Sequence, residues 1–344
     1  MRRRSFIAAS VGSVVAGLAG WKSLQARTEA GALARSDELP SGQRLYVGTD
    51  SAFGTTISVK LLHADQRQAE LAIQDALHEA KKIDALMSIH SENSQIFRLN
   101  RDGRLQNPDP HLLAVLEQAR RLSALTDGAF DITVQPLWLQ FSEAAARNAL
   151  PSSEKRLAAK SLVNWKNLLV EQDQLRFQQA GMAITLNGIA QGYAVDLALS
   201  AVRARGVKHA LLDTGEFISS GTRTPDRDWV LGVRDPRQTD KYTIALQMDG
   251  RSVATSGDYE TTFTPDFLHH HIFDPSTGDS PPELASVTVV APTGLLADGL
   301  STAFFVMGSE KAMSLASQLD KVELLLVDKK GKVWKTPNLR ELPA

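Results

Sequence analysis

Predicted strands and helices do not alternate regularly along this chain of 344 residues, and their order limits the folds that it can adopt. Apolar residues at helical spacing predict helices, and β-branched runs of alternating polarity predict strands. The predicted helices cover about residues 65–87, 109–125, 191–205, 298–306 and 309–319. The predicted strands cover residues 55–61, within the stretch 47–62, and residues 208–213, 229–234, 242–248 and 286–291, with a hairpin across 329–332. A doubly wound parallel sheet needs regular alternation, so this order favours an α+β fold.

Two adjacent arginines, Arg3 and Arg4, stand just before a weakly apolar run from Ile7 to Gly20. This pattern is typical of a twin-arginine signal, which directs folded proteins across the bacterial inner membrane. The run is shorter than the roughly 20 apolar residues of a spanning helix, so a cleaved leader is favoured over an anchor. We predict a signal peptide over residues 1–26, a polar linker over 27–43, and a mature periplasmic protein without a stable membrane span.

The chain has no cysteine and a formal net charge of −1. The absence of cysteine excludes disulfides, thiolate metal sites and cysteine nucleophiles. The balanced charge does not indicate nucleic acid as a partner. Any metal must therefore be held by oxygen or imidazole, and the fold must be stabilised by its core.

Two segments rich in small residues are candidate binding loops. In TDGAFDIT, residues 126–133, the glycine and Ala129 allow close backbone approach, Phe130 offers a planar face and Asp131 an acceptor. The alternative is a helix stop with a buried phenylalanine. In ITLNGIAQGY, residues 184–193, a predicted strand meets a glycine-containing helix start whose free N–H groups suit phosphate. Here the alternative is tight strand–helix packing.

Three consecutive histidines end in His271, and they follow the segment SGDYE, residues 256–260, in a predicted strand-turn-strand pair. Neighbours on a strand point to opposite faces, so only His269 and His271 could share a metal, and no helical histidine pair completes a zinc site. A single working histidine near Asp258 or Asp274 is favoured over zinc, because imidazole accepts a proton near neutral pH.

Oxygen-bearing side chains share one face of a helix that is predicted to begin near residue 298. Asp298, Ser301 and Thr302 stand at positions i, i+3 and i+4. Three hard oxygens suit Mg²⁺ or Ca²⁺ rather than a soft metal. The alternative is that Asp298 is an N-cap with ordinary hydroxyls behind it.

The order of these segments resembles that of the FAD:protein FMN transferases, the ApbE-like family. The resemblance covers about residues 45–330 and rests on residues 87–100 and on TDGAFDIT, ITLNGIAQGYAVD, DTGEF, SGDYE, HHIFDP and ADGLSTAFFVMG. It implies a single α+β domain over residues 44–340, with mixed or antiparallel sheets and packed helices. It also implies an activity that splits FAD and attaches FMN, by a phosphoester bond, to a threonine or serine of a target flavoprotein, releasing AMP.

The resemblance also implies roles for individual residues. Its flavin contacts match Ala129, Phe130, Asp131, Thr185, Gln191 and Ile272, and His90 could pack with Phe130 on a flavin or adenine ring. Its metal site, for Mg²⁺ or Ca²⁺, matches the backbone carbonyl of Gly188 and the side chains of Asp298, Ser301 and Thr302. Its working histidine matches His271, and its loop with an acid matches residues 214–216. Many members carry an ionisable residue where this chain has Thr185 and Gln191.

In this interpretation a divalent ion neutralises the pyrophosphate and His271 accepts the proton of the acceptor hydroxyl. Two alternatives are a periplasmic FAD-binding or delivery protein and a metal-dependent FAD pyrophosphatase, in which water replaces the hydroxyl. A binding protein needs neither a base nor a metal, so the presence of both favours an enzyme. The LNGIAQGY segment further resembles that of the NosX-like branch, which serves maturation of the nitrous oxide reduction system. The expected acceptors include membrane-bound electron-transfer proteins.

Overall fold

The computed structural model describes residues 33–39 and 42–342, so the predicted signal peptide lies outside the described residues. The helices are α1 (Gln66–Met87), α2 (Gln95–Asp102), α3 (Pro110–Leu125), α4 (Gln135–Ala145), α5 (Ser153–Lys160), α6 (Ala190–Ala204) and α7 (Gly294–Ala316). The strands are β1 (Leu33–Glu38), β2 (Arg44–Ala52), β3 (Thr55–His63), β4 (Arg104–Gln106), β5 (Leu168–Val170), β6 (Gln174–Phe177), β7 (His209–Asp213), β8 (Phe217–Ser220), β9 (Val230–Arg234), β10 (Tyr242–Gln247), β11 (Ser252–Gly257), β12 (Leu284–Ala291), β13 (Glu323–Asp328) and β14 (Val333–Lys335).

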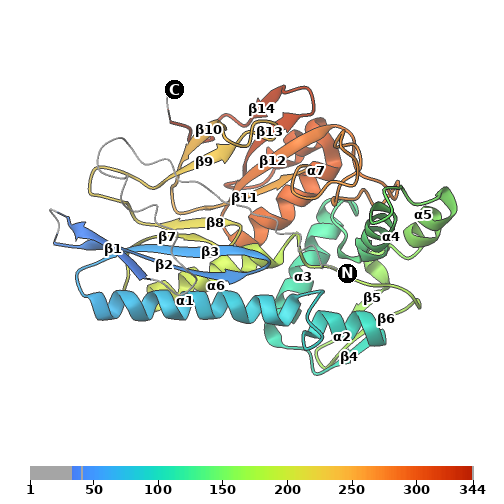
Figure 1. Ribbon diagram of the computed structural model, residues 1–344, viewed down its shortest axis with the longest axis horizontal. Helices are drawn as coiled ribbons and strands as arrows, with labels where there is room; N and C mark the ends of the chain where they lie inside the picture. Colours follow the sequence, from blue (N-terminus) through green and yellow to red (C-terminus); the bar gives the residue numbers. More distant parts are fainter. Residues whose placement is uncertain (1–32, 40–41, 343–344) are drawn as a thin grey trace.

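A nine-stranded antiparallel sheet runs through the molecule in the order β1-β2-β3-β7-β8-β11-β12-β13-β14 (Figure 1). Two smaller antiparallel sheets, β9–β10 and β4–β6–β5, stand apart from it. The α+β prediction is therefore confirmed, and the paired strands are antiparallel throughout the described chain.

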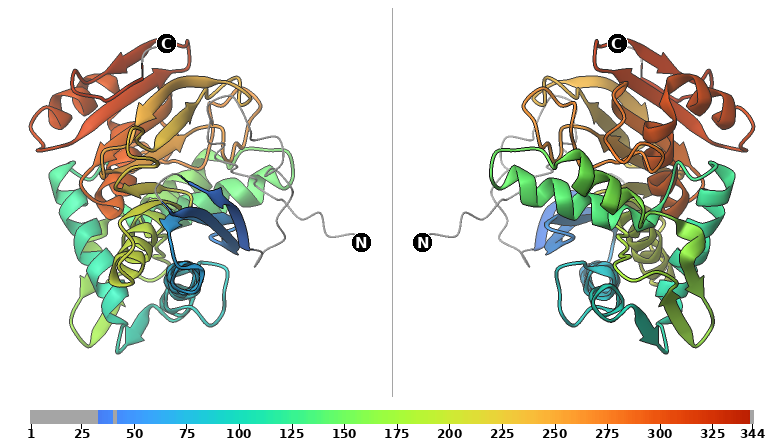
Figure 2. Two further views of the ribbon diagram at one scale, coloured as in Figure 1. Left: turned by 90° about the vertical axis from the view of Figure 1, so that its left-hand side faces the viewer. Right: turned by 90° about the vertical axis from the view of Figure 1, so that its right-hand side faces the viewer.

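Helices cover the large sheet at two places. Helices α1 and α6 pack on β2, β3 and β7, and the apolar side chains between them form one core cluster. In Figure 2, where α1 is seen nearly end-on, these strands lie between α1 and the β9–β10 hairpin, which covers their other face. Helix α7 packs on β11 and β12, and every residue of β12 is buried. Within the described ranges, no helix is long and apolar enough to cross a membrane.

Local sequence signals explain most of the element bounds. Helices α1 and α3 begin where Asp65 and Asp109 accept a hydrogen bond from a first-turn N–H, which satisfies a donor that the helix itself leaves unpaired. Helix α6 is followed by Gly206 with a φ of 78°, a left-handed conformation that glycine adopts without strain.

Several expected elements differ in the structure. Residues 182–186, before α6, form no strand and have no regular secondary structure. Helix α7 begins at Gly294, not near Asp298, and the two helices expected at its place are one element interrupted at Gly308, whose φ is 77°. The prediction of a linker over residues 27–43 is wrong in part. Leu33–Glu38 form strand β1, which pairs with β2.

Candidate active site

A cavity of about 340 Å³ opens where β11, the start of α6 and the start of α7 meet. All but two of the predicted site residues line it, although they come from widely separated segments. Those that line it are Ala129, Phe130, Asp131, Thr185, Gly188, Gln191, His271, Ile272, Asp298 and Thr302. The other two are His90, which is exposed while its neighbour Ile89 lines the cavity, and Ser301, which is completely buried behind it.

One wall is the turn that follows α3. Phe130 is 3 % exposed, and its backbone N–H donates to the Thr126 hydroxyl at 3.1 Å. Hydrogen bonds fix the Asp131 carboxylate. Its Oδ1 accepts from the backbone N–H and the hydroxyl of Thr133, and its Oδ2 accepts from the backbone N–H of Trp165 at 3.0 Å. Burial raises the pKa of the Asp131 carboxyl. The turn therefore combines both sequence interpretations, since it stops a helix and also lines the cavity.

A second wall is the loop between β7 and β8 with the start of α6. The side-chain amide of Gln191 donates to the Thr214 carbonyl at 3.0 Å, and the Thr214 hydroxyl donates to the Gln191 carbonyl at 2.9 Å. Gly215 has a φ of 101°, and a Cβ there would stand 2.0 Å from Gln191 Nε2. Glycine is therefore required at this position for Gln191 to reach across the loop.

The starts of α6 and α7 cross at two glycines. A Cβ at Gly192 would lie 2.1 Å from the carbonyl oxygen of Gly294, so the backbones touch. Each helix supplies the acceptor that the other lacks, since Asp298 Oδ2 accepts from the Gly192 N–H at 2.9 Å and Asp196 accepts from the Gly294 N–H at 2.7 Å. The expectation that the Gly192 N–H is free for phosphate is therefore wrong, and the tight-packing alternative holds for this glycine.

The predicted metal residues lie around this crossing. Thr293 is the N-cap of α7, so the alternative of Asp298 as N-cap of its own helix is wrong. The Ser301 hydroxyl donates to the Asp298 carbonyl oxygen at 2.8 Å and lies 2.7 Å from the Ser256 hydroxyl. Gly188 lies against Thr302, because a Cβ on this glycine would stand 2.7 Å from the Thr302 hydroxyl.

Two buried carboxyls face this oxygen-rich corner. Burial raises the pKa of Asp298 to about 7, although the hydrogen bond from Gly192 acts in the opposite direction. Burial and the nearby Asp298 raise the pKa of Glu216 well above its ordinary value. Neither carboxyl forms an ion pair with any residue in the described part of the chain. A divalent cation would compensate both charges, and hydroxyl, carbonyl and carboxylate oxygens are the donors that Mg²⁺ and Ca²⁺ take.

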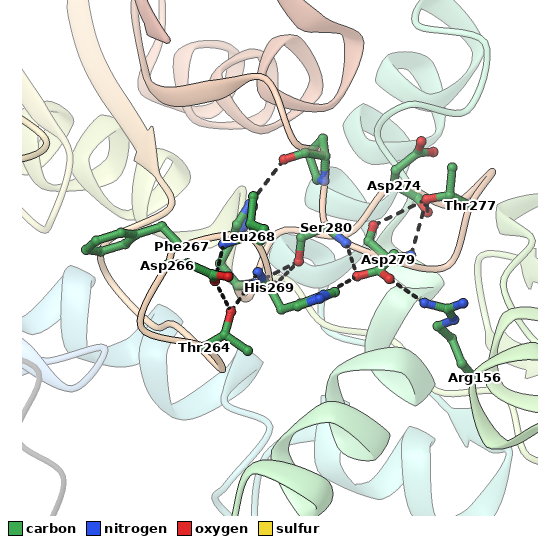
Figure 3. A network of polar contacts seen from close by, with 12 residues as sticks. Arg156, Thr264, Asp266, Phe267, Leu268, His269, Asp274, Thr277, Asp279 and Ser280 are labelled. Carbon is green, nitrogen blue, oxygen red and sulfur yellow. Dashed lines mark hydrogen bonds and ion pairs between the residues drawn. The ribbon is translucent and has the colours of Figure 1, made fainter. Parts of the chain in front are cut away.

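The three consecutive histidines enter three different environments, and their segment is mostly irregular rather than a strand. His269 Nδ1 lies 2.7 Å from Asp279, which also binds Arg156, as Figure 3 shows. His270 is completely buried against Phe305, and burial lowers its pKa to about 3. No group of three histidine, aspartate or glutamate side chains in the described ranges is arranged to hold a metal.

His271 reaches the cavity with its ring oriented by the backbone. Its Nδ1 lies 3.2 Å from the carbonyl oxygen of Thr261, which can only accept, so Nδ1 carries the proton and Nε2 keeps its lone pair. Desolvation lowers the pKa of His271, while the Thr261 carbonyl and the negative charge of Asp258 act to raise it. The expected partners Asp258 and Asp274 do not contact the ring, since Asp258 is bound by Arg237 and Asp274 by Ser276.

Glu216 and Ser256 are among the lining residues that the sequence did not assign to flavin or metal binding. Glu216 belongs to the DTGEF segment, where the acid itself was the available signal, and its Oε2 accepts from the Thr255 N–H at 3.1 Å. Ser256 belongs to SGDYE and connects β11 to Ser301 of α7. Its role depends on the pairing of distant elements, so no pattern along the chain indicates it.

The fold and this cavity define an α+β protein with one composite site of imidazole, hydroxyl and carboxyl groups. The sequence model of the ApbE family matches residues 53–326, and the chain belongs to that family. The FAD:protein FMN transferase of Vibrio cholerae is 28 % identical over 290 residues, which is 80 % of this chain and 85 % of that protein. The Escherichia coli K12 FAD:protein FMN transferase is 29 % identical over 275 residues, covering 75 % of this chain and 77 % of that protein.

Solved structures agree with this assignment. The crystal structure of the ApbE protein of Thermotoga maritima superposes with a TM-score of 0.76 at 30 % identity, covering 85 % of this chain and 97 % of that one. The flavin transferase ApbE of Vibrio cholerae superposes with a TM-score of 0.74 at 25 % identity, covering 86 % and 98 % of the two chains.

Proposed function

We propose that this protein is an FAD:protein FMN transferase. It splits the pyrophosphate of FAD, attaches FMN through a phosphoester to a threonine or serine of a target flavoprotein, and releases AMP. The observation that carries this proposal is that one cavity holds a neutral imidazole with an available Nε2 and an oxygen-rich corner with two uncompensated carboxyls. The named relatives above support the substrate and the reaction.

The residues of the corner fit a hard divalent cation. The Gly188 carbonyl and the side chains of Asp298 and Thr302 would hold Mg²⁺ or Ca²⁺, and Ser301 would support them through its bonds to Asp298 and Ser256. When bound, the cation supplies charge neutralisation at the pyrophosphate. The carboxyl of Asp298 must be ionised to bind it, and the raised pKa keeps that carboxyl near half-ionised at neutral pH without the metal.

His271 is the proton acceptor for the incoming hydroxyl. Its lowered pKa keeps the ring neutral at neutral pH, and the Thr261 carbonyl fixes the tautomer that leaves Nε2 basic. General-base assistance of this kind contributes about 10²–10⁴-fold to a rate. Phe130, Ile272 and the small Ala129 supply an apolar wall for the flavin ring, and Thr185 and Gln191 supply neutral hydrogen-bonding groups.

We further propose that the protein acts in the periplasm after twin-arginine export. Its acceptor would be a periplasmic flavoprotein or a membrane-bound electron-transfer protein, and the nitrous oxide reduction system is one candidate. These proposals rest on Arg3, Arg4 and the LNGIAQGY segment, not on the cavity.

Mass spectrometry of an acceptor tests the activity. The mature protein is incubated with FAD, Mg²⁺ and a purified flavoprotein domain, and the intact acceptor is weighed. A transferase adds one FMN to the acceptor and releases AMP in equal amount. Release of FMN and AMP without a heavier acceptor would instead indicate a pyrophosphatase, and tight FAD binding without cleavage a delivery protein.

A further inference from the structure

Residues 259–272 form a hairpin that leaves the end of β11 and returns to the cavity, and we call it the histidine hairpin. It carries both His271 and the carbonyl of Thr261 that orients the ring. Its arms are joined by backbone bonds from the His271 N–H to the Thr261 carbonyl at 3.0 Å and from the Phe263 N–H to the His269 carbonyl at 2.8 Å. The position of His271 therefore depends on the position of the whole hairpin.

A charge cluster around one buried carboxylate holds the base of this hairpin. Asp258 directly precedes it and is completely buried. Arg237, from the turn after β9, donates to both Asp258 oxygens at 2.7 Å, and Lys329, from the turn after β13, donates to Asp258 Oδ2 at 3.0 Å. Both contacts are charge-assisted hydrogen bonds, which are the stronger kind.

The same two cations hold the tip of the hairpin. The Lys329 ammonium also donates to the carbonyl of Phe267, and the Arg237 guanidinium lies 4.3 Å from the centre of the Phe267 ring. Phe267 has a φ of 60°, which is a strained conformation for a bulky residue and persists only where neighbours impose it. On the opposite side, His269 is held by Asp279, as Figure 3 shows.

We propose that Arg237, Asp258 and Lys329 are positioning residues for the reaction, and that they act by holding His271 in place. This inference rests on the function proposed above. None of the three lines the cavity, so they act through the hairpin and not on the substrate. The cluster joins the turns after β9 and β13 to the base and the tip of the hairpin. The fold of these two turns does not depend on the cluster. The turn of Lys329, for example, is closed by its own backbone bond from Asp328 to Lys332 at 3.0 Å.

Removal of Lys329 should loosen the hairpin and leave the sheet intact. In Lys329→Met we expect a kcat lower by about 10- to 100-fold, since misplacement by about 1 Å can cost 10² in rate. The dissociation constant for FAD should change less, because Ala129 and Phe130 of the flavin wall lie outside the hairpin. Lys329→Arg keeps the charge and should recover most of the rate. Lys330→Met, at the exposed neighbour on the same turn, is the matched control and should behave as the wild type. A lower melting temperature with an unchanged kcat in Lys329→Met would overturn the proposal.

A double variant separates this inference from the proposed function. If the cluster acts through His271, adding Lys329→Met to His271→Ala should cause no further loss of rate. A further tenfold loss would show that the cluster acts elsewhere, and the proposal would fail.

A ring-nitrogen NMR measurement on His271 needs no activity at all. The wild type should show a single tautomer with the proton on Nδ1, and Lys329→Met should show mixed tautomers. If the wild type transfers no FMN but the ring changes in this way, the proposed function fails and the positioning holds. If the His271 tautomer is unchanged in Lys329→Met, the positioning role is refuted, whatever the activity of the protein.

Discussion

The carboxylate of Asp298 accepts a 2.9 Å hydrogen bond from the backbone N–H of Gly192, and this contact joins the predicted metal residue to the start of α6. Helix α6 has no side-chain cap from its own N-cap residue, Ile189. Asp298 therefore has two tasks, because it caps a neighbouring helix and also contributes the buried charge that a cation would compensate.

The two tasks can be separated by substitution. Asp298→Asn keeps an oxygen for the Gly192 N–H and removes the charge, so we expect a folded protein without Mg²⁺-dependent FAD turnover. Asp298→Ala should lose the same activity and also about 1–2 kcal/mol of unfolding free energy, because a buried N–H is left without a partner. Asp196→Ala removes the acceptor of the Gly294 and Leu295 N–H groups and leaves the N-cap Thr293 in place, so it should lower stability and retain Mg²⁺-dependent turnover. Urea unfolding and an FAD cleavage assay measure the two effects, and full activity of Asp298→Asn in a chelator would contradict the metal site.

The raised pKa of Asp298 predicts how stability depends on pH. A carboxyl whose pKa rises from 3.8 to about 7 binds more protons in the folded state than in the unfolded state between these values. The contribution of this carboxyl to folding stability is therefore complete below about pH 4 and is lost as the pH rises towards 7. Over this window the melting temperature of the metal-free protein should fall relative to that of Asp298→Asn. Mg²⁺ should raise the melting temperature increasingly over the same window. A constant difference between the two proteins would show that the carboxyl titrates normally.

The glycine crossing predicts a large loss of stability for a small change. Gly192→Ala places a Cβ 2.1 Å from the Gly294 carbonyl oxygen, and that backbone cannot move without displacing α7. We expect a loss of about 3 kcal/mol or more in unfolding free energy, or no folded protein. Gly103→Ala is the control, because nothing lies within 4 Å and only its φ of 69° opposes a side chain, which costs about 1 kcal/mol. Equal losses in the two variants would mean that the helices can separate.

The three histidines should respond differently to alanine substitution. His271→Ala should bind FAD as the wild type does and transfer FMN at least about 10²-fold more slowly. His269→Ala loses the contact to Asp279 and should show a milder loss of rate. His270→Ala opens a cavity against Phe305 and should lower the melting temperature more than the rate. Equal losses of rate in all three variants would contradict the separate environments.

The proposed export rests on Arg3 and Arg4, which lie outside the described ranges. Replacing Arg3 and Arg4 with lysine should leave the precursor in the cytoplasm, because the twin-arginine route requires this pair. Cell fractionation followed by immunoblotting measures the distribution. Normal periplasmic accumulation of this variant would refute the export route.

Much of the local structure could be predicted along the chain. The helix from Gln66 to Met87 and the strand from Thr55 to His63 are evident from periodicity, because each buries one face and must repeat apolar residues at its own period. The helix start at Gly294 was missed, since its cap Thr293 precedes an apolar stretch without amphipathic pattern. Residues 184–186 were misread as a strand because Ile184 and Thr185 are β-branched, but their backbone groups bond to the Asn100 side chain and the Ile132 carbonyl rather than to a neighbouring strand.

By itself the sequence determined the α+β class and, through the order of its motifs, the residue types that line the cavity. Only the tertiary structure decided which atoms remain available there. The Gly192 N–H is taken by Asp298, and the ring of His271 is fixed by a carbonyl ten residues away. Such pairings depend on how separate helices and turns pack. A one-dimensional pattern records which groups a chain carries, but their partners are set by contacts between segments far apart in the sequence.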